Sequence, residues 1–182
     1  VVEFAPEDKI IWDLCRPMTT KSRFIASYKY HTLLRMDEEF RNEILTEQVD
    51  QLLQSMINAA DEFSIICVVD YNKGVVTERL MEGIAENIGQ KKIRVIVDTK
   101  RATFEIFKNV HVIKPNQKEF ELSKEIYGFR DSTNDAFATH IYESFGIENI
   151  VVTKGNKGID LYSRGTLTAT FEAHDTVPLE LS

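Results

Sequence analysis

Apolar residues along this chain follow two spacings, one typical of amphipathic helices and one typical of buried strands. Repeats every three or four residues predict helices over residues 46–60, 77–89, 119–127 and 132–145. Short apolar runs between them predict strands over residues 63–69, 93–97, 110–113 and 149–153. Because strands and helices alternate, we expect right-handed crossovers and a mostly parallel sheet with helices on both faces. The pattern therefore predicts an α/β fold.

Capping residues support the predicted helix ends. The expected N-caps are Thr46, Thr77 and Ser132 (boxed with Asp135), and the expected terminating glycines are Gly89, Gly128 and Gly146.

The two ends of the chain have strand patterns of a different kind. Residues 21–27 and 30–36 alternate and predict a β-hairpin, after a short predicted strand at residues 10–12. Residues 158–163 and 166–172 predict a second antiparallel pair, joined by Arg164 and Gly165. We therefore divide the chain into a lid-like β segment, residues 1–37, and an α/β nucleotide-binding core, residues 38–182.

Composition narrows the class of protein. A 182-residue chain with 43% hydrophobic and 28% charged residues is typical of one globular domain. Its net charge of −7 argues against nucleic-acid binding, and no apolar run is long enough to span a membrane. Cys67 lies in an apolar run, far from Cys15, which predicts a buried, reduced thiol and a cytoplasmic protein.

Polar residues follow each strand of the predicted parallel sheet, where ligands bind in such folds. If the sheet is parallel, these four segments share one edge and surround a common hollow. They are residues 70–74, 98–101, 114–119 and 153–158.

The junction after the strand at residues 110–113 carries the first candidate chemistry. Pro115 ends the strand, and Asn116 and Glu119 stand at the start of a helix. A helix N-terminus suits phosphate, and a carboxylate beside it can hold a metal ion or its water shell. The alternative is a capping box, in which Asn116 and Glu119 only satisfy backbone N–H groups.

The segment after residue 152 has a similar ambiguity. Thr153, Gly155 and Gly158 can bring a hydroxyl and backbone N–H groups close to a phosphate, although the segment lacks a Walker ending. The alternative is a tight turn between two strands. Two interpretations are likewise possible for Lys73, Lys100 and Arg101. They either contact a ligand or are solvated charges in loops. Asp70 and Asp98 are either site carboxylates or ordinary turn residues.

These segments resemble the ribokinase-like carbohydrate kinases of the phosphofructokinase-B family. Within the family they are most similar to the heptose-7-phosphate kinase domain of ADP-heptose synthase. The resemblance covers nearly the whole chain and rests on residues 116–119, 152–158, 16–26, 33–37, 70–74 and 98–100.

The resemblance implies an ATP- and Mg²⁺-dependent kinase with the ribokinase-like fold. Its favoured substrate would be D-glycero-D-manno-heptose 7-phosphate, phosphorylated at O1 in ADP-heptose synthesis for lipopolysaccharide. By resemblance, Asn116, Glu119, Thr153, Gly155 and Gly158 would serve ATP, with Glu119 near Mg²⁺. The residues implied to bind the sugar phosphate are Arg23, Lys73, Asp98 and Lys100.

The resemblance also implies that this chain is an internal piece of a kinase. The family's Gly-Ala-Gly-Asp segment, which supplies the base and an anion hole, would lie beyond Ser182. We therefore assign no catalytic residue and expect the piece alone to be inactive. The hairpin's apolar residues Phe24, Ala26 and Leu34 suggest a homodimer contact. Another sugar or nucleoside kinase, or a non-catalytic nucleotide-binding domain, remains the alternative.

Overall fold

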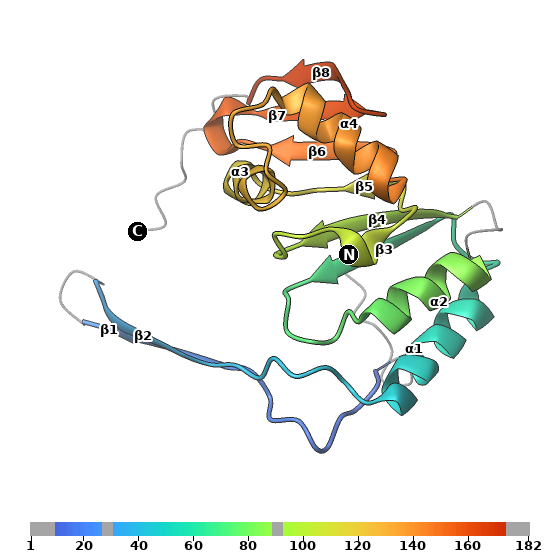
Figure 1. Ribbon diagram of the computed structural model, residues 1–182. Helices are drawn as coiled ribbons and strands as arrows, with labels where there is room; N and C mark the ends of the chain where they lie inside the picture. The colour runs from blue at the N-terminus through green and yellow to red at the C-terminus, as the bar shows by residue number, and fades with distance from the viewer. Residues whose placement is uncertain (1–9, 27–30, 89–92, 174–182) are drawn as a thin grey trace.

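The computed structural model describes residues 10–26, 31–88 and 93–173 (Figure 1). The strands are β1 Thr20–Ile25, β2 Thr32–Glu38, β3 Ile65–Asp70, β4 Arg94–Thr99, β5 Val112–Ile113, β6 Asn149–Thr153, β7 Ile159–Ser163 and β8 Thr166–Phe171. The helices are α1 Thr46–Ala59, α2 Glu78–Ile88, α3 Gln117–Ile126 and α4 Asn134–Phe145, with 3₁₀ turns η2 Glu105–Phe107 and η3 Gly155–Lys157.

The main sheet has six strands in the order β3-β4-β5-β6-β7-β8. Strands β3 to β6 pair in parallel, and β7 and β8 continue the sheet as antiparallel strands. Figure 1 shows β3 to β8 following one another across the molecule in this order. The predicted mostly parallel sheet and the predicted antiparallel end are both confirmed.

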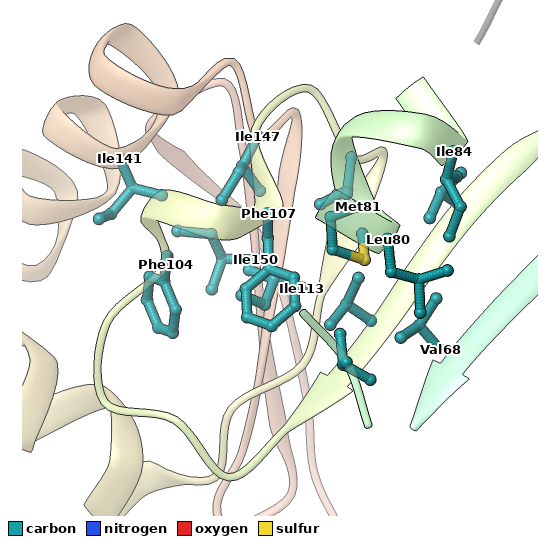
Figure 2. Packing of buried hydrophobic residues seen from close by; sticks show 14 of the residues in the cluster. Val68, Leu80, Met81, Ile84, Phe104, Phe107, Ile113, Ile141, Ile147 and Ile150 are labelled. Atoms are coloured by element: carbon teal, nitrogen blue, oxygen red, sulfur yellow. The ribbon is translucent and has the colours of Figure 1, made fainter. Parts of the chain in front are cut away.

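The hydrophobic core lies on one face of this sheet. Val68, Val97, Ile113 and Ile150 fall in register on that face, and each is at most 8% exposed. Helices supply the other half of the core, as Figure 2 shows for Leu80, Met81 and Ile84 of α2 beside the strand residues. Burial of these side chains stabilises the fold by about 1.5–3 kcal/mol each.

The opposite face of the sheet is only partly covered. Ile65 and Val69 in β3 are 50% and 57% exposed, and Phe171 at the end of β8 is 57% exposed. Cys67 lies between Ile65 and Val69 on the same face and is exposed, so the predicted buried thiol is wrong. Alternate strand residues point to opposite faces, and the core includes only the other set. The sequence pattern predicts helices on both faces of the sheet. Within the described residues, helices cover only the face that carries the core.

The hairpin of β1 and β2 forms a separate two-stranded sheet, as predicted. Phe24 pairs with Leu34, and Met36 lies on the same face. No strand is found at residues 10–12, where Trp12 is 73% exposed and has no neighbouring strand within the described part of the chain.

Two helices begin one residue away from the predicted caps. Thr46 is the first residue of α1, which follows Leu45, and α4 is capped by the Thr133 hydroxyl, which accepts from the Ala136 N–H at 3.2 Å. Thr77 does cap α2, and Gly146 ends α4 with a φ of 66°. The predicted stop at Gly89 lies outside the described residues. Across the described helices, none has the length and apolar character needed to cross a membrane.

Candidate active site

The carboxyl ends of β3, β4, β5 and β6 lie along one edge of the sheet. Val69 pairs with Asp98, Ile113 with Ile150, and Asn116 forms a parallel bridge with Thr153. The predicted common rim is therefore confirmed. The rim carries two cavities with no lining residue in common, rather than the single expected hollow.

The first cavity, of about 790 Å³, lies beside the N-terminal half of α3. Its lining includes three predicted residues, Asn116, Thr153 and Gly155, together with Lys118 and Lys154. The lining also includes the carboxylates of Glu121 and Glu125, so its side-chain charges balance, and the helix N-terminus is the feature that suits an anionic ligand.

Asn116 and Glu119 form the capping box that was the alternative to a ligand site. The Asn116 Oδ1 accepts from the Glu119 N–H at 3.0 Å, and the Glu119 Oε2 accepts from the Asn116 N–H at 2.8 Å. The other Glu119 oxygen, Oε1, accepts from Lys100 Nζ at 2.9 Å. This hydrogen bond raises the pKa of Lys100. The cap therefore also holds Lys100 at the rim.

Glu119 is a single carboxylate, which suits a metal ion that keeps most of its water ligands better than a metal ion bound by protein side chains alone. Among the described residues, no group of three or more His, Cys, Asp or Glu side chains could hold a metal. Both Glu119 oxygens already accept hydrogen bonds. Mg²⁺ is commonly held by one or two carboxylates together with water and substrate phosphates, so a single carboxylate is compatible with it.

Residues 153–158 form the tight turn that was the alternative to a phosphate loop. The Lys154 N–H donates to the Gly158 carbonyl at 2.8 Å, and the Gly158 N–H donates to the Gly155 carbonyl at 3.1 Å. Gly155 faces open space beside the cavity, whereas Gly158 is buried against the backbone of Phe171 and lies outside the lining. The turn and a ligand site are thus compatible, and the two glycines have different surroundings.

Lys154 is paired within the same turn. Its Nζ donates to the Asp160 carboxylate at 2.5 Å, and Thr170 donates to that carboxylate at 2.9 Å. Burial disfavours the ionised form of Asp160, but these hydrogen bonds outweigh burial and leave the pKa of Asp160 below its ordinary value. Asp160 therefore holds Lys154 in place at the edge of the first cavity.

The second cavity, of about 500 Å³, lies where the hairpin meets the end of β3. Lys73 lines it and pairs with Glu39, which also lies 3.8 Å from Lys21 Nζ and 3.6 Å from Arg41 Nη2. The hydrogen bond from Lys73 lowers the pKa of Glu39. Three cations around one carboxylate leave an excess of positive charge that favours an anion.

The remaining predicted residues lie apart from the cavity linings. Asp98 pairs with Lys114 at 2.9 Å between the two cavities, and its Oδ1 is buried with no hydrogen-bond partner among the described residues. Arg23 lies in β1 opposite Arg35 and lines neither cavity. The structure thus brings Asp98 and Lys100 to the rim and leaves Arg23 on the hairpin.

The structure also adds residues that the sequence did not single out. Lys21 and Glu39 meet Lys73 because the base of the hairpin lies against the loop after β3. Lys118 and Lys154 line the first cavity. Lys154 carried a signal, since it stands between Thr153 and Gly155, whereas no local pattern marks Glu39.

The mostly parallel sheet flanked by helices is the ribokinase-like α/β fold. The chain belongs to the pfkB family of carbohydrate kinases, whose pattern matches residues 20–177. Proteins of this family are phosphotransferases that use ATP.

Individual relatives agree with this assignment. The bifunctional protein HldE of Syntrophotalea carbinolica is 30% identical over 153 residues, which are 84% of this chain and 31% of that protein. A mutant of phosphofructokinase-2 from Escherichia coli matches with a TM-score of 0.61 and 18% identity over 86% of this chain and 51% of that chain. Ribokinase from Thermotoga maritima matches with a TM-score of 0.57 and 22% identity, over 86% and 49%. The chain thus spans about a third of the curated relative and half of the solved structures.

Proposed function

We propose that this chain is the nucleotide- and acceptor-binding part of an ATP-dependent sugar phosphate kinase. The observation that carries the proposal is the pair of cavities on one rim, with β4 between them. Phosphoryl transfer depends mainly on positioning two substrates and neutralising charge, so two neighbouring cavities suit it, one at a helix N-terminus and one beside a cluster of cations.

ATP would occupy the first cavity. Asn116, Thr153 and Gly155 line it, and Gly158 shapes the turn that presents Gly155. Glu119 would hold a hydrated Mg²⁺ at the phosphates. When bound, Mg²⁺ neutralises negative charge on phosphate oxygens.

The acceptor sugar phosphate would occupy the second cavity. Lys73 lines it, and Asp98 and Lys100 stand on the neighbouring strand end toward the first cavity. Arg23 would take part only if the hairpin moves toward the rim. The similarity to HldE supports D-glycero-D-manno-heptose 7-phosphate as the substrate, phosphorylated at O1 toward ADP-heptose and lipopolysaccharide.

We assign the general base to polypeptide outside residues 1–182. No described carboxylate at the rim is proposed for that role, because Asp70, Asp98 and Glu119 are each engaged by a cation. The chain alone is therefore expected to show little turnover and weak nucleotide binding. Because the reaction consumes ATP, we place it in the cytoplasm.

The test is ATP consumption by the longer parent protein with heptose 7-phosphate, ribose, fructose 6-phosphate or adenosine as acceptor. We expect a preference for heptose 7-phosphate. Equal activity with another sugar would keep the kinase and remove the heptose assignment. ATP binding without turnover of any acceptor would favour a non-catalytic nucleotide-binding domain.

A further inference from the structure

The carboxylate of Asp70 is buried at the end of β3, where the residue is 2% exposed. Its Oδ2 accepts from Arg101 Nε at 2.6 Å and from the Thr99 hydroxyl at 3.1 Å. Its Oδ1 accepts from the Asn72 N–H at 2.8 Å. A buried carboxylate is tolerated only when it is paired and hydrogen-bonded, so Arg101 is needed to keep Asp70 in place.

Arg101 makes a second contact at the other end of the same loop. Its Nη2 donates to the Val76 carbonyl at 2.6 Å. One guanidinium therefore joins residue 70, where β3 ends, to residue 76, just before α2 begins. The planar group carries several fixed N–H donors, whereas a lysine has a single nitrogen and cannot reproduce both bonds in this geometry.

The loop between these ends supports the second cavity and the base of the hairpin. Asn72 and Gly74 have positive φ values of 54° and 79°, and a non-glycine residue in that region needs its surroundings to hold it. The Gly74 carbonyl accepts from the Ile44 N–H at 2.9 Å. Lys73, between Asn72 and Gly74, lines the cavity and pairs with Glu39.

We propose that Arg101 is a positioning residue for the acceptor site, because it fixes both ends of loop 70–76 and thereby aims Lys73 at the second cavity. The identity of the ligand rests on the proposed function. Arg101 does not line the cavity and acts through the loop. The first cavity shares no lining residue with this loop, so nucleotide binding should not depend on Arg101.

The test compares Arg101→Lys with Arg79→Lys in the full 182-residue chain. Arg101→Lys keeps a positive charge near Asp70 but loses the bond to Val76. Arg79 is the control, because its Nε and Nη2 likewise donate two hydrogen bonds, both to the Asp50 carboxylate and away from both cavities. Calorimetry measures binding of heptose 7-phosphate and of Mg-ATP, and hydrogen exchange measures the amides of residues 71–76 and Ile44.

We expect Arg101→Lys to weaken heptose 7-phosphate binding about tenfold, to change Mg-ATP binding less than about twofold, and to speed exchange in the loop and at Ile44. Arg79→Lys should change none of these. Unchanged sugar phosphate affinity and unchanged exchange in Arg101→Lys would overturn the proposal. Equal losses of both affinities, with faster exchange throughout the chain, would also overturn it by showing a general loss of stability.

A separate result would identify failure of the proposed function. If the unmodified chain binds no sugar phosphate, the ligand assignment is wrong, and exchange alone decides the role of Arg101. Faster exchange confined to residues 71–76 and Ile44 would then support Arg101 as the residue that positions the loop. Exchange that is unchanged, or faster everywhere, would reject that role.

Discussion

Gly155 and Gly158 are three residues apart in one turn, but only Gly155 has room for a side chain. Both have positive φ, at 60° and 86°. A Cβ at Gly155 would meet open space, whereas a Cβ at Gly158 would overlap the carbonyl oxygen of Phe171. The ψ of Gly158 is −141°, in a region that essentially only glycine adopts.

We therefore predict that Gly158→Ala is more destabilising than Gly155→Ala. Gly155→Ala should cost about 1 kcal/mol, the penalty of a left-handed conformation without a steric overlap. Gly158→Ala should cost about 3 kcal/mol, because the backbone conformation and the overlap with β8 both oppose it. Urea unfolding followed by circular dichroism measures the two free energies. Equal costs would contradict the distinction between the two glycines.

Residue roles were predictable where both partners lie close in the sequence. Asn116 and Glu119 are three positions apart, so both the cap and the phosphate-binding hypotheses could be read from spacing. The pairing of Glu119 with Lys100 could not be read from spacing, because it joins the first turn of α3 to the loop after β4, 19 positions away in the sequence. The burial predicted for Cys67 is wrong for a related reason, since an apolar run does not reveal which of its two faces is covered.

At the scale of elements, the base of the hairpin depends on the ionised Glu39. Its pKa is lowered from an ordinary value of 4.5 by the hydrogen bond from Lys73. A carboxyl with a lowered pKa binds fewer protons in the folded chain than in the unfolded one. Its contribution to stability is therefore present above the ordinary pKa and is lost as the pH falls through the lowered value.

We predict that the Tm difference between the unmodified chain and Glu39→Gln is largest near pH 7 and shrinks toward zero as the pH falls below 4.5 and through the lowered pKa of Glu39. Thermal unfolding from pH 7 to pH 3 measures this difference. Glu43→Gln, a nearby exposed carboxyl change, is the control and should not reproduce the pattern. A difference that grows on acidification would mean that the Glu39 carboxylate opposes folding.

The hairpin itself has one apolar and one charged face. Phe24, Leu34 and Met36 lie on the first, and Arg23 and Arg35 face each other on the second. The apolar residues are between 47% and 56% exposed, and a two-stranded ribbon has little core of its own. Exposed apolar faces often mark interaction sites, and we infer a second copy of the chain as the partner of this one.

We predict that the chain forms a dimer through this face and that Leu34→Ser shifts it toward the 20.9 kDa monomer. Leu33→Ser is the matched control, since Leu33 is adjacent and 71% exposed but points to the charged face. Light scattering after size exclusion measures the mass. A Leu34→Ser protein that stays dimeric would place the contact on another surface.

The order of elements was predictable because each segment carries its own periodicity and caps. The α/β pattern, the first hairpin and the antiparallel end are all found at the expected places. Helix starts shifted by one residue at Leu45 and Thr133, where several neighbouring residues could cap. The short strand expected at residues 10–12 is absent from the described fold, since an apolar triplet needs a neighbouring strand to pair with.

At the scale of the whole molecule, the sheet has two unequal faces. Parallel sheets are normally covered on both sides, and the sequence pattern alone favoured that arrangement. In the structure the helices and the core lie on the face of Val68 and Val97, and the face of Ile65, Cys67 and Val69 is exposed at β3. Which face receives a cover depends on where the crossovers run, and alternating apolar residues do not encode that choice.

The exposed face makes Cys67 a probe of what covers the sheet. A thiol reacts only when a reagent reaches it, so Cys67 in the native chain should react with a maleimide about as fast as the exposed Cys15. Mass spectrometry of Cys15→Ser and Cys67→Ser proteins measures the two rates separately.

Protection of Cys67 that disappears on dilution would show that a second copy covers this face. Protection that persists on dilution and ends only on unfolding would mean that the chain covers the face itself, contrary to the fold described above. Protection of Cys67 in a longer protein that contains this chain, but not in this chain, would mean that additional polypeptide covers the face.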